Sequence, residues 1–465
     1  MRLKPEHWGF ECNSDDGLLL GGVGADDLAQ RFGTPLHVVD EPILRGRVRR
    51  FQQAFRSAYP GPVATHYAFK TNNVPGVVRM LQEEGLEPEV GTLYERRLAL
   101  ELGWAPEQIV VNGPNKGALL REVVADGAGL IVVDGFEELR VLDALTAEGD
   151  CDVDILLRIN PDCVPRGMNR ASATGSRRAS VFGFDIVSGE VAEALSFVAA
   201  RPRLQFQGLH VHAGTGIRRP KDYREPLRRV IACAKEAFRL GLSTRILDVG
   251  GGFGVPTSRE FSTPEFLMYQ GMGRLPSAPD PCAFPGDDAF ADAVCGTVVK
   301  SCRRHGLPLP TLVLEPGRTL VSGAGVLLVT VGSVKERPGA GTWVITDGGA
   351  GTVAFPLFYE YHEVLLTRSP GAPRNHRYHL VGSACHAADW IYRNKQMPEL
   401  KPGDVLAICD AGAYFTVQEC NFGFSRPAIV ATTEGEVRML RRRETFADLV
   451  ARDLNWKEEP CRARA

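Results

Sequence analysis

The stretch Ala64-Thr-His-Tyr-Ala-Phe-Lys70-Thr-Asn-Asn73 is an apolar, aromatic run that ends in a lysine. Its composition predicts a buried strand. Lysine is rarely buried without a partner, but desolvation lowers the pKa of its amine and makes that amine a nucleophile toward carbonyl groups. The structural alternative is a lysine whose ammonium extends into solvent. The rest of the chain has to decide between these two interpretations of Lys70.

Short apolar segments alternate with helical segments along the following part of the chain. Eight strands are predicted, at residues 64–70, 87–91, 109–113, 130–134, 154–160, 207–214, 245–251 and 312–315. Helical segments lie between them, for example at 75–84, 94–102, 135–147 and 223–240. Eight strands that alternate with helices predict an α/β fold, a parallel (β/α)8 barrel of the TIM type. An open doubly wound sheet is the alternative.

The chain outside the barrel has a different pattern. A predicted strand at 34–40 precedes an amphipathic helix at 41–58. After residue 315 a period of two predicts strands at 319–334, 342–346, 363–367, 377–381, 405–409 and 428–433, with a helix only near 445–453. We expect a barrel over residues 41–315 and a mainly antiparallel β domain over 316–465, joined by strands from residues 1–40.

Two inserts interrupt the alternation of strands and helices. Residues 162–180 are rich in Arg, Ser and Gly and predict a mobile loop after the fifth strand. Residues 261–288 contain many Pro and Gly and predict an open insert after the seventh strand. Both inserts follow the carboxyl ends of strands, the face on which a barrel places its active site.

Composition excludes several classes of function. The 465 residues are 44% hydrophobic and 24% charged with a formal net charge of −2, so there is no basic excess for nucleic acid. No apolar run approaches the roughly 18 residues that a membrane span requires. The eleven cysteines include no CxxC pair, and residues 1–6 lack the apolar core of a signal peptide. We therefore expect reduced thiols and a cytoplasmic location.

Polar side chains recur where the predicted barrel strands end. They are Lys70, Glu89, Asn112, Asp134, Arg158, Asn160, His210, His212, Asp248 and Glu315. The segment Gly250-Gly-Gly-Phe-Gly254 follows one of these ends and allows a close backbone approach with free N–H groups, which suits a phosphate. It has neither the P-loop lysine nor the GxGxxG spacing. A tight barrel turn is the alternative.

These parts together match the needs of one cofactor. Pyridoxal phosphate requires an amine for a Schiff base, N–H groups for its phosphate, a flat ring to stack on its own ring and an acid opposite the pyridine nitrogen. A lysine, a glycine turn, a histidine and a carboxylate at one barrel mouth supply all four. The sequence therefore predicts pyridoxal 5'-phosphate as the cofactor.

Five ordered segments resemble a known family. They are residues 68–73 (AFKTNN), 210–215 (HVHAGT), 248–254 (DVGGGFG), 315–318 (EPGR) and 409–414 (CDAGAY). In this combination they are similar to the pyridoxal phosphate-dependent decarboxylases of the alanine racemase-like fold (fold type III). That group includes diaminopimelate, ornithine, lysine and arginine decarboxylases. The resemblance extends from about residue 35 to 430.

The resemblance implies a role for each matching residue. Lys70 would bind the cofactor covalently, His212 would stack on its ring and Glu315 would face the pyridine nitrogen. Arg158 would line the ring, and Arg318 would serve the phosphate or a substrate group. The remaining phosphate ligands would be Thr215, Gly250, Gly251, Gly252 and Tyr414.

The segment Val381-Gly-Ser-Ala-Cys385-His-Ala-Ala-Asp389 resembles the Gly-Pro-x-Cys-Glu/Asp-x-x-Asp motif of these decarboxylases. The resemblance implies that Cys385 protonates the substrate carbon after carbon dioxide leaves. In the family this cysteine enters the active site from the second subunit, so the resemblance implies a homodimer with active sites at the subunit interface. The resemblance also implies a small amino acid as the substrate. A small buried apolar residue is the alternative for Cys385.

Departures from the family motifs bear on the substrate. Diaminopimelate decarboxylases have an acid where this chain has His386, and an arginine for the distal carboxylate where it has Phe355. An aromatic ring cannot replace a bidentate guanidinium. Glu360 and Asp389 are instead candidates to pair with a distal ammonium. Glu89 and Val181 are smaller departures, standing where aspartate and lysine are usual.

The sequence thus predicts a pyridoxal phosphate-dependent decarboxylase of a linear diamino acid, lysine or ornithine, rather than a true diaminopimelate decarboxylase. The D form is favoured, since diaminopimelate decarboxylases act at a D centre. The expected substrate contacts are Arg318, Phe355, Glu360, His386 and Asp389. The alternatives are a larger siderophore or carrier-linked intermediate, meso-diaminopimelate, a racemase, and a cofactor-binding or sensing protein without turnover.

Overall fold

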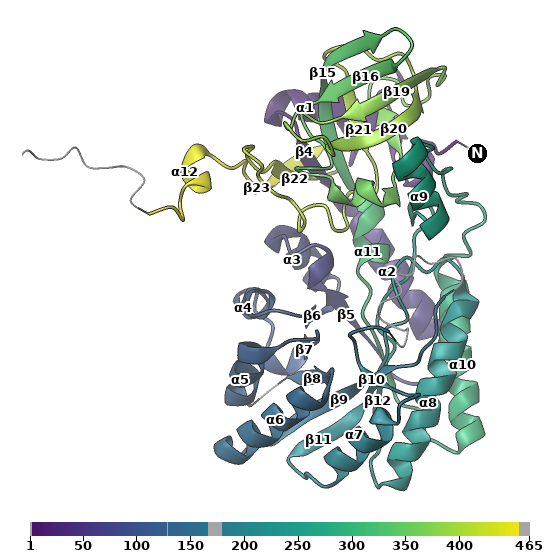
Figure 1. The fold of residues 1–465 in the computed structure, drawn as a ribbon, viewed down its shortest axis with the longest axis vertical. Helices are drawn as coiled ribbons and strands as arrows, with labels where there is room; N and C mark the ends of the chain where they lie inside the picture. Colours follow the sequence, from purple (N-terminus) through teal and green to yellow (C-terminus); the bar gives the residue numbers. More distant parts are fainter. Residues whose placement is uncertain (1, 128, 166–178, 455–465) are drawn as a thin grey trace, which may run out of the picture.

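A computed structural model describes residues 2–127, 129–165 and 179–454. Figure 1 shows two parts along the long axis, a barrel wrapped in helices and a β domain at one end. The predicted loop at 162–180 falls largely outside the described residues. Within the described residues, no helix combines the length and the apolar character needed to cross a membrane.

The barrel is a closed ring of eight parallel strands. In ring order the strands are β5 (Val63–Ala68), β6 (Glu87–Val90), β7 (Val110–Val111), β8 (Leu130–Val133), β9 (Val153–Asn160), β11 (Leu204–His210), β12 (Ile246–Asp248) and β14 (Thr311–Leu314). The ring closes because β14 pairs with β5 in parallel. The prediction of a (β/α)8 barrel is confirmed, and the open-sheet alternative is wrong.

Helices cover the outside of the barrel. They are α2 (Glu41–Ala58), α3 (Pro75–Glu83), α4 (Leu93–Glu101), α5 (Gly117–Asp126), α6 (Phe136–Gly149), α7 (Glu190–Ala199), α8 (Arg224–Arg239) and α10 (Gly286–His305). The predicted amphipathic helix is α2, whose Phe51 and Phe55 rings pack on Phe253 at centroid distances of 5.2 and 5.5 Å. Asp40 caps its start by accepting a hydrogen bond from the amide of Ile43.

The β domain is built on one large sheet. Its strand order is β20 (Trp390–Met397), β19 (His376–Val381), β16 (Gly341–Thr346), β15 (Gly325–Arg337), β4 (Leu36–Asp40), β22 (Ala428–Thr433) and β23 (Glu436–Arg441). Two further strands, β21 (Val405–Ile408) and β18 (Val364–Leu366), extend it from β15. Most pairings are antiparallel, as predicted. The N-terminal β4 lies between β15 and β22, so residues near the start of the chain complete this sheet.

Three local predictions are wrong. The strand predicted at 319–334 begins only at Gly325, because α11 (Arg318–Val321) and a 3-10 turn (Ser322–Ala324) precede it. Among residues 1–40, α1 (Ala25–Phe32) is a helix where strands were expected. Lys70 lies in a 3-10 turn (Phe69–Thr71) directly after β5 rather than in the strand itself.

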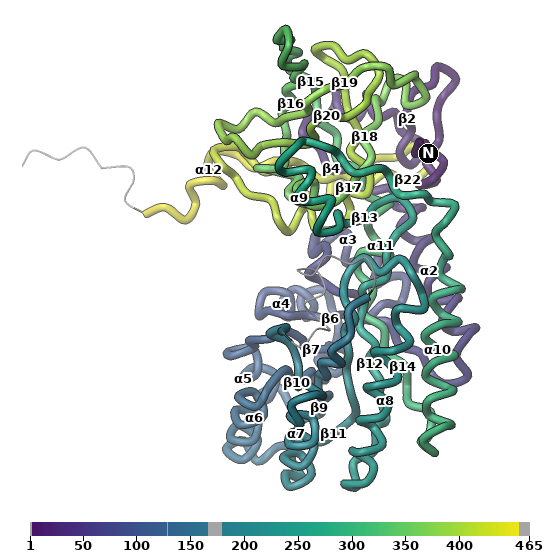
Figure 2. Tube along the Cα trace, turned by 45° about the vertical axis from the view of Figure 1, so that its right-hand side comes forward, coloured from purple at the N-terminus to yellow at the C-terminus, as the bar shows by residue number. Residues whose placement is uncertain are grey.

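The insert at 261–288 is folded onto the β domain instead of being open. It contains α9 (Thr263–Met272) and ends inside α10. Phe261 and Tyr269 belong to the hydrophobic core of the β domain, and the Tyr269 hydroxyl accepts a hydrogen bond from the Arg393 amide at 3.1 Å. Figure 2 shows α9 against the β domain. A folded insert leaves less room for a large conjugated substrate than an open one.

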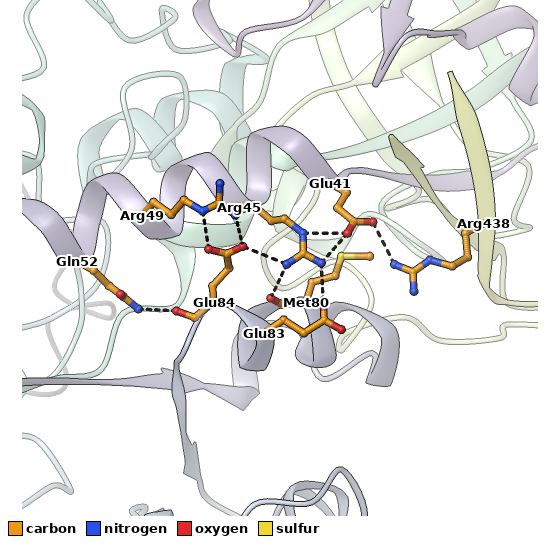
Figure 3. Close-up of polar contacts among 8 residues, drawn as sticks. All are labelled: Glu41, Arg45, Arg49, Gln52, Met80, Glu83, Glu84 and Arg438. Atoms are coloured by element: carbon orange, nitrogen blue, oxygen red, sulfur yellow. Dashed lines mark hydrogen bonds and ion pairs between the residues drawn. The ribbon is translucent and has the colours of Figure 1, made fainter. Parts of the chain in front are cut away.

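An ion-pair network joins barrel helices to the β domain (Figure 3). Arg45 of α2 donates hydrogen bonds to Glu41 at 2.7 Å and to Glu84 at 3.0 Å. Arg438 of β23 donates to the other oxygen of Glu41 at 3.0 Å. Glu41 therefore links α2 to the outermost strand of the β domain, and Arg45 links α2 to the end of α3.

Candidate active site

A cavity of about 420 Å³ opens at the carboxyl ends of the barrel strands. Five of the predicted cofactor residues line it, namely Lys70, Arg158, His212, Thr215 and Glu315. These residues are far apart in the sequence, and the closed parallel barrel brings their strand ends to one face. Glu89 and Asn112, two of the other polar strand ends, also line the cavity.

Lys70 projects into this cavity and is paired. Its Nζ donates a hydrogen bond to Glu89 Oε2 at 2.7 Å, while the side chain stays 52% exposed. Burial lowers the pKa of Lys70, but the carboxylates of Glu89 and Glu315 outweigh burial and raise it above its ordinary value. Burial raises the pKa of Glu89 to about 7, against the opposing effect of Lys70. A contact with a buried carboxylate disfavours the interpretation of Lys70 as a solvent-directed lysine.

Glu315 lies at the centre of a buried polar cluster. Asn112 Nδ2 donates to Glu315 Oε1 at 3.1 Å, and His210 Nε2 lies 3.3 Å from Oε2. Burial raises the pKa of Glu315, but His210 and Lys70 outweigh burial and hold it well below its usual range. One polar atom of Asp248 lies within 4.8 Å of His210 and Glu315. Glu315 is therefore a carboxylate held in its charged form at the barrel mouth.

His212 is an uncharged ring in this cavity. Burial and the cations Arg158 and Lys70 lower its pKa to about 3. Its Nδ1 accepts a hydrogen bond from the Gly251 amide at 3.3 Å, which fixes the ring orientation. A neutral flat ring in a fixed orientation suits stacking on a ligand ring.

The guanidinium of Arg158 lies 4.3 Å from the centroid of the Phe182 ring and 3.4 Å from Asp134 Oδ1.

The glycine run after β12 is required by close backbone packing. A Cβ atom on Gly251 would lie 2.3 Å from the Glu315 carbonyl oxygen, and one on Gly252 would lie 2.0 Å from the Gly214 carbonyl oxygen. Gly252 also has a φ of +88°, which favours glycine. The tight-turn interpretation is thus confirmed, and it produces a narrow backbone cradle beside Thr215. Phosphate binding by this cradle stays a prediction.

Arg318 and Glu360 form a buried bidentate ion pair. The Nη1 and Nη2 atoms of Arg318 each lie 2.7 Å from a different carboxylate oxygen of Glu360. His362 Nε2 lies 3.1 Å from the same carboxylate, and Glu360 has no exposed surface. The arginine is also 4.9 Å from the Tyr414 ring. Glu360 is consequently engaged within the protein, which differs from the expectation that it faces a substrate ammonium.

Asp389 organises the loop that carries Cys385. Its Oδ1 accepts a hydrogen bond from the Gly351 amide at 2.8 Å and its Oδ2 accepts one from the Ala384 amide at 3.0 Å. Only 3% of Asp389 is exposed, and a Cβ on Gly382 would lie 2.1 Å from its carboxylate. This position also differs from the expected direct contact with a substrate. Asp389 instead positions the neighbouring residues of the loop.

Cys385, His386 and Phe355 lie on the surface of the β domain. Cys385 is exposed, so the alternative of a buried small apolar residue is wrong. His386 lies against Phe422, and Phe355 stacks on Phe358 at a centroid distance of 6.2 Å. None of the three lines the Lys70 cavity of the described chain. Supply of Cys385 by a second subunit stays a prediction.

Comparisons with known proteins agree with this site. Residues 45–322 match the pyridoxal-binding domain of the pyridoxal-dependent decarboxylases. A diaminopimelate decarboxylase of Actinosynnema pretiosum subsp. auranticum is 35% identical, over 94% of this chain and 92% of the relative. That of Bacillus subtilis (strain 168) is 31% identical, over 96% and 97%.

The chain belongs to the pyridoxal-dependent decarboxylases. A crystal structure of diaminopimelate decarboxylase from M. jannaschii is similar, with a TM-score of 0.82 and 27% identity over 96% of this chain and 97% of that one. The sequence predicted a lysine or ornithine decarboxylase rather than a true diaminopimelate decarboxylase. Relatives that are named diaminopimelate decarboxylase conflict with that prediction. The overall resemblance is to that enzyme, and the departures at Phe355 and His386 are local.

Pyridoxal phosphate is the cofactor of this decarboxylase, and the residues present fit it. The cavity offers one amine at Lys70, a charged carboxylate at Glu315, a neutral ring at His212 and a backbone cradle that admits no Cβ. Two residues were missed from the sequence. Phe182 lines the cavity and stacks on Arg158, and Glu95 accepts a hydrogen bond from the Gly91 amide at 2.7 Å. The Gly-Thr-x-x-Glu spacing after β6 was a usable signal for Glu95, because it predicts a helix start.

Proposed function

We propose that this decarboxylase converts a linear diamino acid, lysine or ornithine with the D form favoured, to a diamine and carbon dioxide. The observation that carries this proposal is Phe355, which stands where the family resemblance places an arginine for a distal carboxylate. Phe355 is 46% exposed and stacks on Phe358. An aromatic surface of this kind can cover an aliphatic chain and attract an ammonium over its ring faces, but it cannot hold a carboxylate.

The nearby arginine supports the same substrate class. Both Nη atoms of Arg318 are occupied by Glu360, so they are committed to a buried pair rather than to a ligand carboxylate. Because Glu360 is paired with Arg318, it is not available to a substrate ammonium. Phe355 and His386 therefore remain as the residues proposed to select the substrate. Their surface position means that they would act at the entrance of a site completed by a second subunit.

In the proposed reaction Lys70 binds the cofactor, and Glu89 accepts a proton from the Lys70 amine and later returns it. The amine must lose a proton before it attacks a carbonyl, and Glu89 is the carboxylate in contact with it at 2.7 Å. The pKa of Glu89, about 7, suits a group that accepts and returns a proton near neutral pH. When bound, pyridoxal phosphate supplies an electron sink for the electron pair that departing carbon dioxide leaves behind.

Glu315 and Cys385 have separate proposed roles. Glu315, charged and held by Asn112 and His210, would keep a proton at the pyridine nitrogen of the bound cofactor. Cys385 of a second subunit donates a proton to the substrate carbon. Holding the charge at Glu315 requires no movement during the reaction, which is the advantage of a preorganised carboxylate.

A second candidate is decarboxylation of meso-diaminopimelate, favoured by relatives of that name that match the full length of the chain. One experiment separates the two. Purified holoenzyme is supplied with D-lysine, L-lysine, D-ornithine, L-ornithine or meso-diaminopimelate, and carbon dioxide and the product are measured together. Lys70→Ala serves as the inactive control.

The proposal expects equal amounts of diamine and carbon dioxide from at least one of the four diamino acids, at a higher kcat/KM than for meso-diaminopimelate. Lysine formed from meso-diaminopimelate, without turnover of the other four, would establish the second candidate instead. Loss of the Cα hydrogen without gas release would indicate a racemase.

A further inference from the structure

A second cavity, of about 360 Å³, lies in the β domain. We call it the basic pocket, because its wall includes Arg2, Arg374, Arg377 and Lys395 with Glu363 as their acidic neighbour. Residues 275–278 of the folded insert form another part of the wall. The pocket shares no lining residue with the Lys70 cavity among the described residues.

The basic pocket carries an excess of positive charge. Arg374 Nη1 and Lys395 Nζ lie 2.8 and 2.7 Å from the same oxygen of Glu363, so one carboxylate serves two cations. The hydroxyl of Tyr361 donates to the other oxygen at 3.1 Å. Arg2 and Arg377 add two further positive charges to the wall. The lining therefore holds four cations and one carboxylate, Glu363, which two of the cations share.

Several buried donor atoms in this wall lack a protein acceptor. The Nε and Nη2 atoms of Arg374 and the Nε atom of Arg2 are buried without a hydrogen-bond partner among the described residues. The Nη atoms of Arg2 donate to the carbonyl oxygens of Pro370 and Gly371 at 2.7 and 3.1 Å, which fixes the position of its guanidinium. Buried donors of this kind are rare and costly when unpaired.

Electrostatic effects on the cations agree with this charge excess. Burial and the charge of Arg374 both lower the pKa of Arg2, and they outweigh the opposing carboxylates of Glu363 and Asp16. Burial lowers the pKa of Lys395, and Arg374 again adds to the effect despite the opposing influence of Glu363. The cations in this wall therefore repel one another, and an anion among them would relieve that repulsion.

We infer that the basic pocket binds a small molecule through a multiply charged oxyanion, of which a phosphate group is the best match. The fork of N–H groups on Arg374 fits two oxygens of a phosphate, and the lining holds three more cations than carboxylates, an excess that a multiply charged anion balances better than a single carboxylate would. The volume falls within the range of small-molecule sites. This inference goes beyond the proposed decarboxylase reaction and gives a role to the insert at 261–288.

The basic pocket and the Cys385 loop lie at opposite ends of one hairpin. Arg377 of β19 pairs with Gln396 of β20 at one end, and Val381 pairs with Trp390 at the other, where the loop with Cys385 follows. A ligand in the basic pocket would thus contact the base of the hairpin rather than its tip. Binding to this pocket can be measured separately from binding at the active site.

Calorimetric titration of the full-length holoenzyme with pyrophosphate tests the inference. The holoenzyme is used so that its own cofactor phosphate occupies the active site, and no amino acid is present. We expect one saturable site per chain, with an affinity that falls as salt is added. Arg374→Gln should abolish binding, and Arg377→Gln, at the exposed rim, should weaken it by about tenfold or more. Arg304→Gln, an exposed arginine of α10, is the matched control and should bind as the wild type does.

Each outcome bears on the inference. Absence of saturable binding, or wild-type affinity in both Arg374→Gln and Arg377→Gln, would overturn it. If Arg374→Gln does not fold, pyrophosphate binding by the folded Arg377→Gln variant still tests the inference. Saturable binding of citrate with none of pyrophosphate would overturn the assignment to phosphate. A failed decarboxylation assay would leave all of these outcomes unchanged, since none of them depends on turnover.

Discussion

At the scale of single residues, the least expected feature is the buried carboxyl of Asp248. Its Oδ1 accepts a hydrogen bond from the Gly250 amide at 2.8 Å, and its Oδ2 is buried without a hydrogen-bond partner among the described residues. One oxygen of this carboxyl lies within 4.8 Å of a Glu315 oxygen. Burial and the Glu315 carboxylate raise the pKa of Asp248 well above its ordinary value. Two buried carboxyls this close cannot both be ionised without a large cost, so we expect Asp248 to hold a proton and Glu315 to hold the charge.

Asp248→Asn tests this expectation, because asparagine is a neutral isostere. A group whose pKa is raised by folding stabilises the protein below its unfolded pKa and loses that contribution as pH rises toward the folded value. The wild type should therefore lose stability relative to Asp248→Asn as pH rises above about 5, with a slope that approaches about 1.4 kcal/mol per pH unit while folded Asp248 keeps its proton. Thermal unfolding of the apoprotein between pH 5 and 8 checks this, with Asp288→Asn, at an exposed site, following the wild type. Parallel pH profiles for Asp248→Asn and the wild type would show that Asp248 is ionised.

Phe355 tests the proposed substrate class directly. Phe355→Arg introduces a guanidinium where the resemblance to diaminopimelate decarboxylases implies one, so we expect kcat/KM for meso-diaminopimelate to rise by about tenfold or more. Turnover of the linear diamino acid should fall, since a cation would then face its ammonium. Phe358→Leu, which alters the stacking partner of Phe355 without adding charge, is the control. An unchanged preference in Phe355→Arg would remove Phe355 from the selective residues.

At the scale of elements, the hairpin β19–β20 presents Cys385 at its tip. Asp389 anchors the loop through the amides of Gly351 and Ala384. Asp389→Ala should leave two partly buried N–H groups without their acceptor and displace Cys385, and we expect kcat to fall by tenfold or more. Binding of pyridoxal phosphate, followed by its visible absorbance, should stay close to the wild-type value because Lys70 is in the barrel.

The control within the same loop is Ser383→Ala, which removes one hydrogen bond to the Thr346 carbonyl oxygen at 2.6 Å and leaves the Asp389 anchor in place. Its effect on kcat should be smaller than that of Asp389→Ala. A wild-type kcat in Asp389→Ala would mean that the loop does not depend on this carboxylate. A parallel loss of cofactor would mean that Asp389 acts on the whole fold instead of on the loop.

At the scale of the whole molecule, the proposed site needs two chains. Lys70 lines the barrel cavity, whereas Cys385 is exposed on the β domain of the same chain. Lys70→Ala and Cys385→Ala should each lower activity strongly when purified alone. Unfolded together and refolded as a mixture, they should regain activity, because a mixed dimer contains one site with both residues intact. A mixture as inactive as its components would place both residues of each site on one chain.

Much of the architecture could be predicted from the sequence, because the period of the apolar residues indicates strands and helices and the position of polar residues indicates the strand ends. Eight apolar segments separated by helices predicted a barrel over an open doubly wound sheet, and in a closed parallel barrel the polar strand ends from Lys70 to Glu315 share one face. The helix at Arg318–Val321 was missed because its residues are as apolar as a strand, and a four-residue helix has no period to detect. The burial of Glu360 could not be predicted, since its partner Arg318 is 42 residues away and joins it only through the tertiary fold.

The most direct test of the central claim is the identity of the lysine that holds the cofactor. The purified holoenzyme is treated with borohydride, which fixes the bound pyridoxal group to its lysine, and the labelled peptide is sequenced by mass spectrometry. We expect the label on Lys70 alone, and no label or visible absorbance band in Lys70→Ala. Label on Lys116, the buried lysine that is paired with Glu138 at 2.7 Å, or an unchanged absorbance band in Lys70→Ala, would contradict the assignment of this active site.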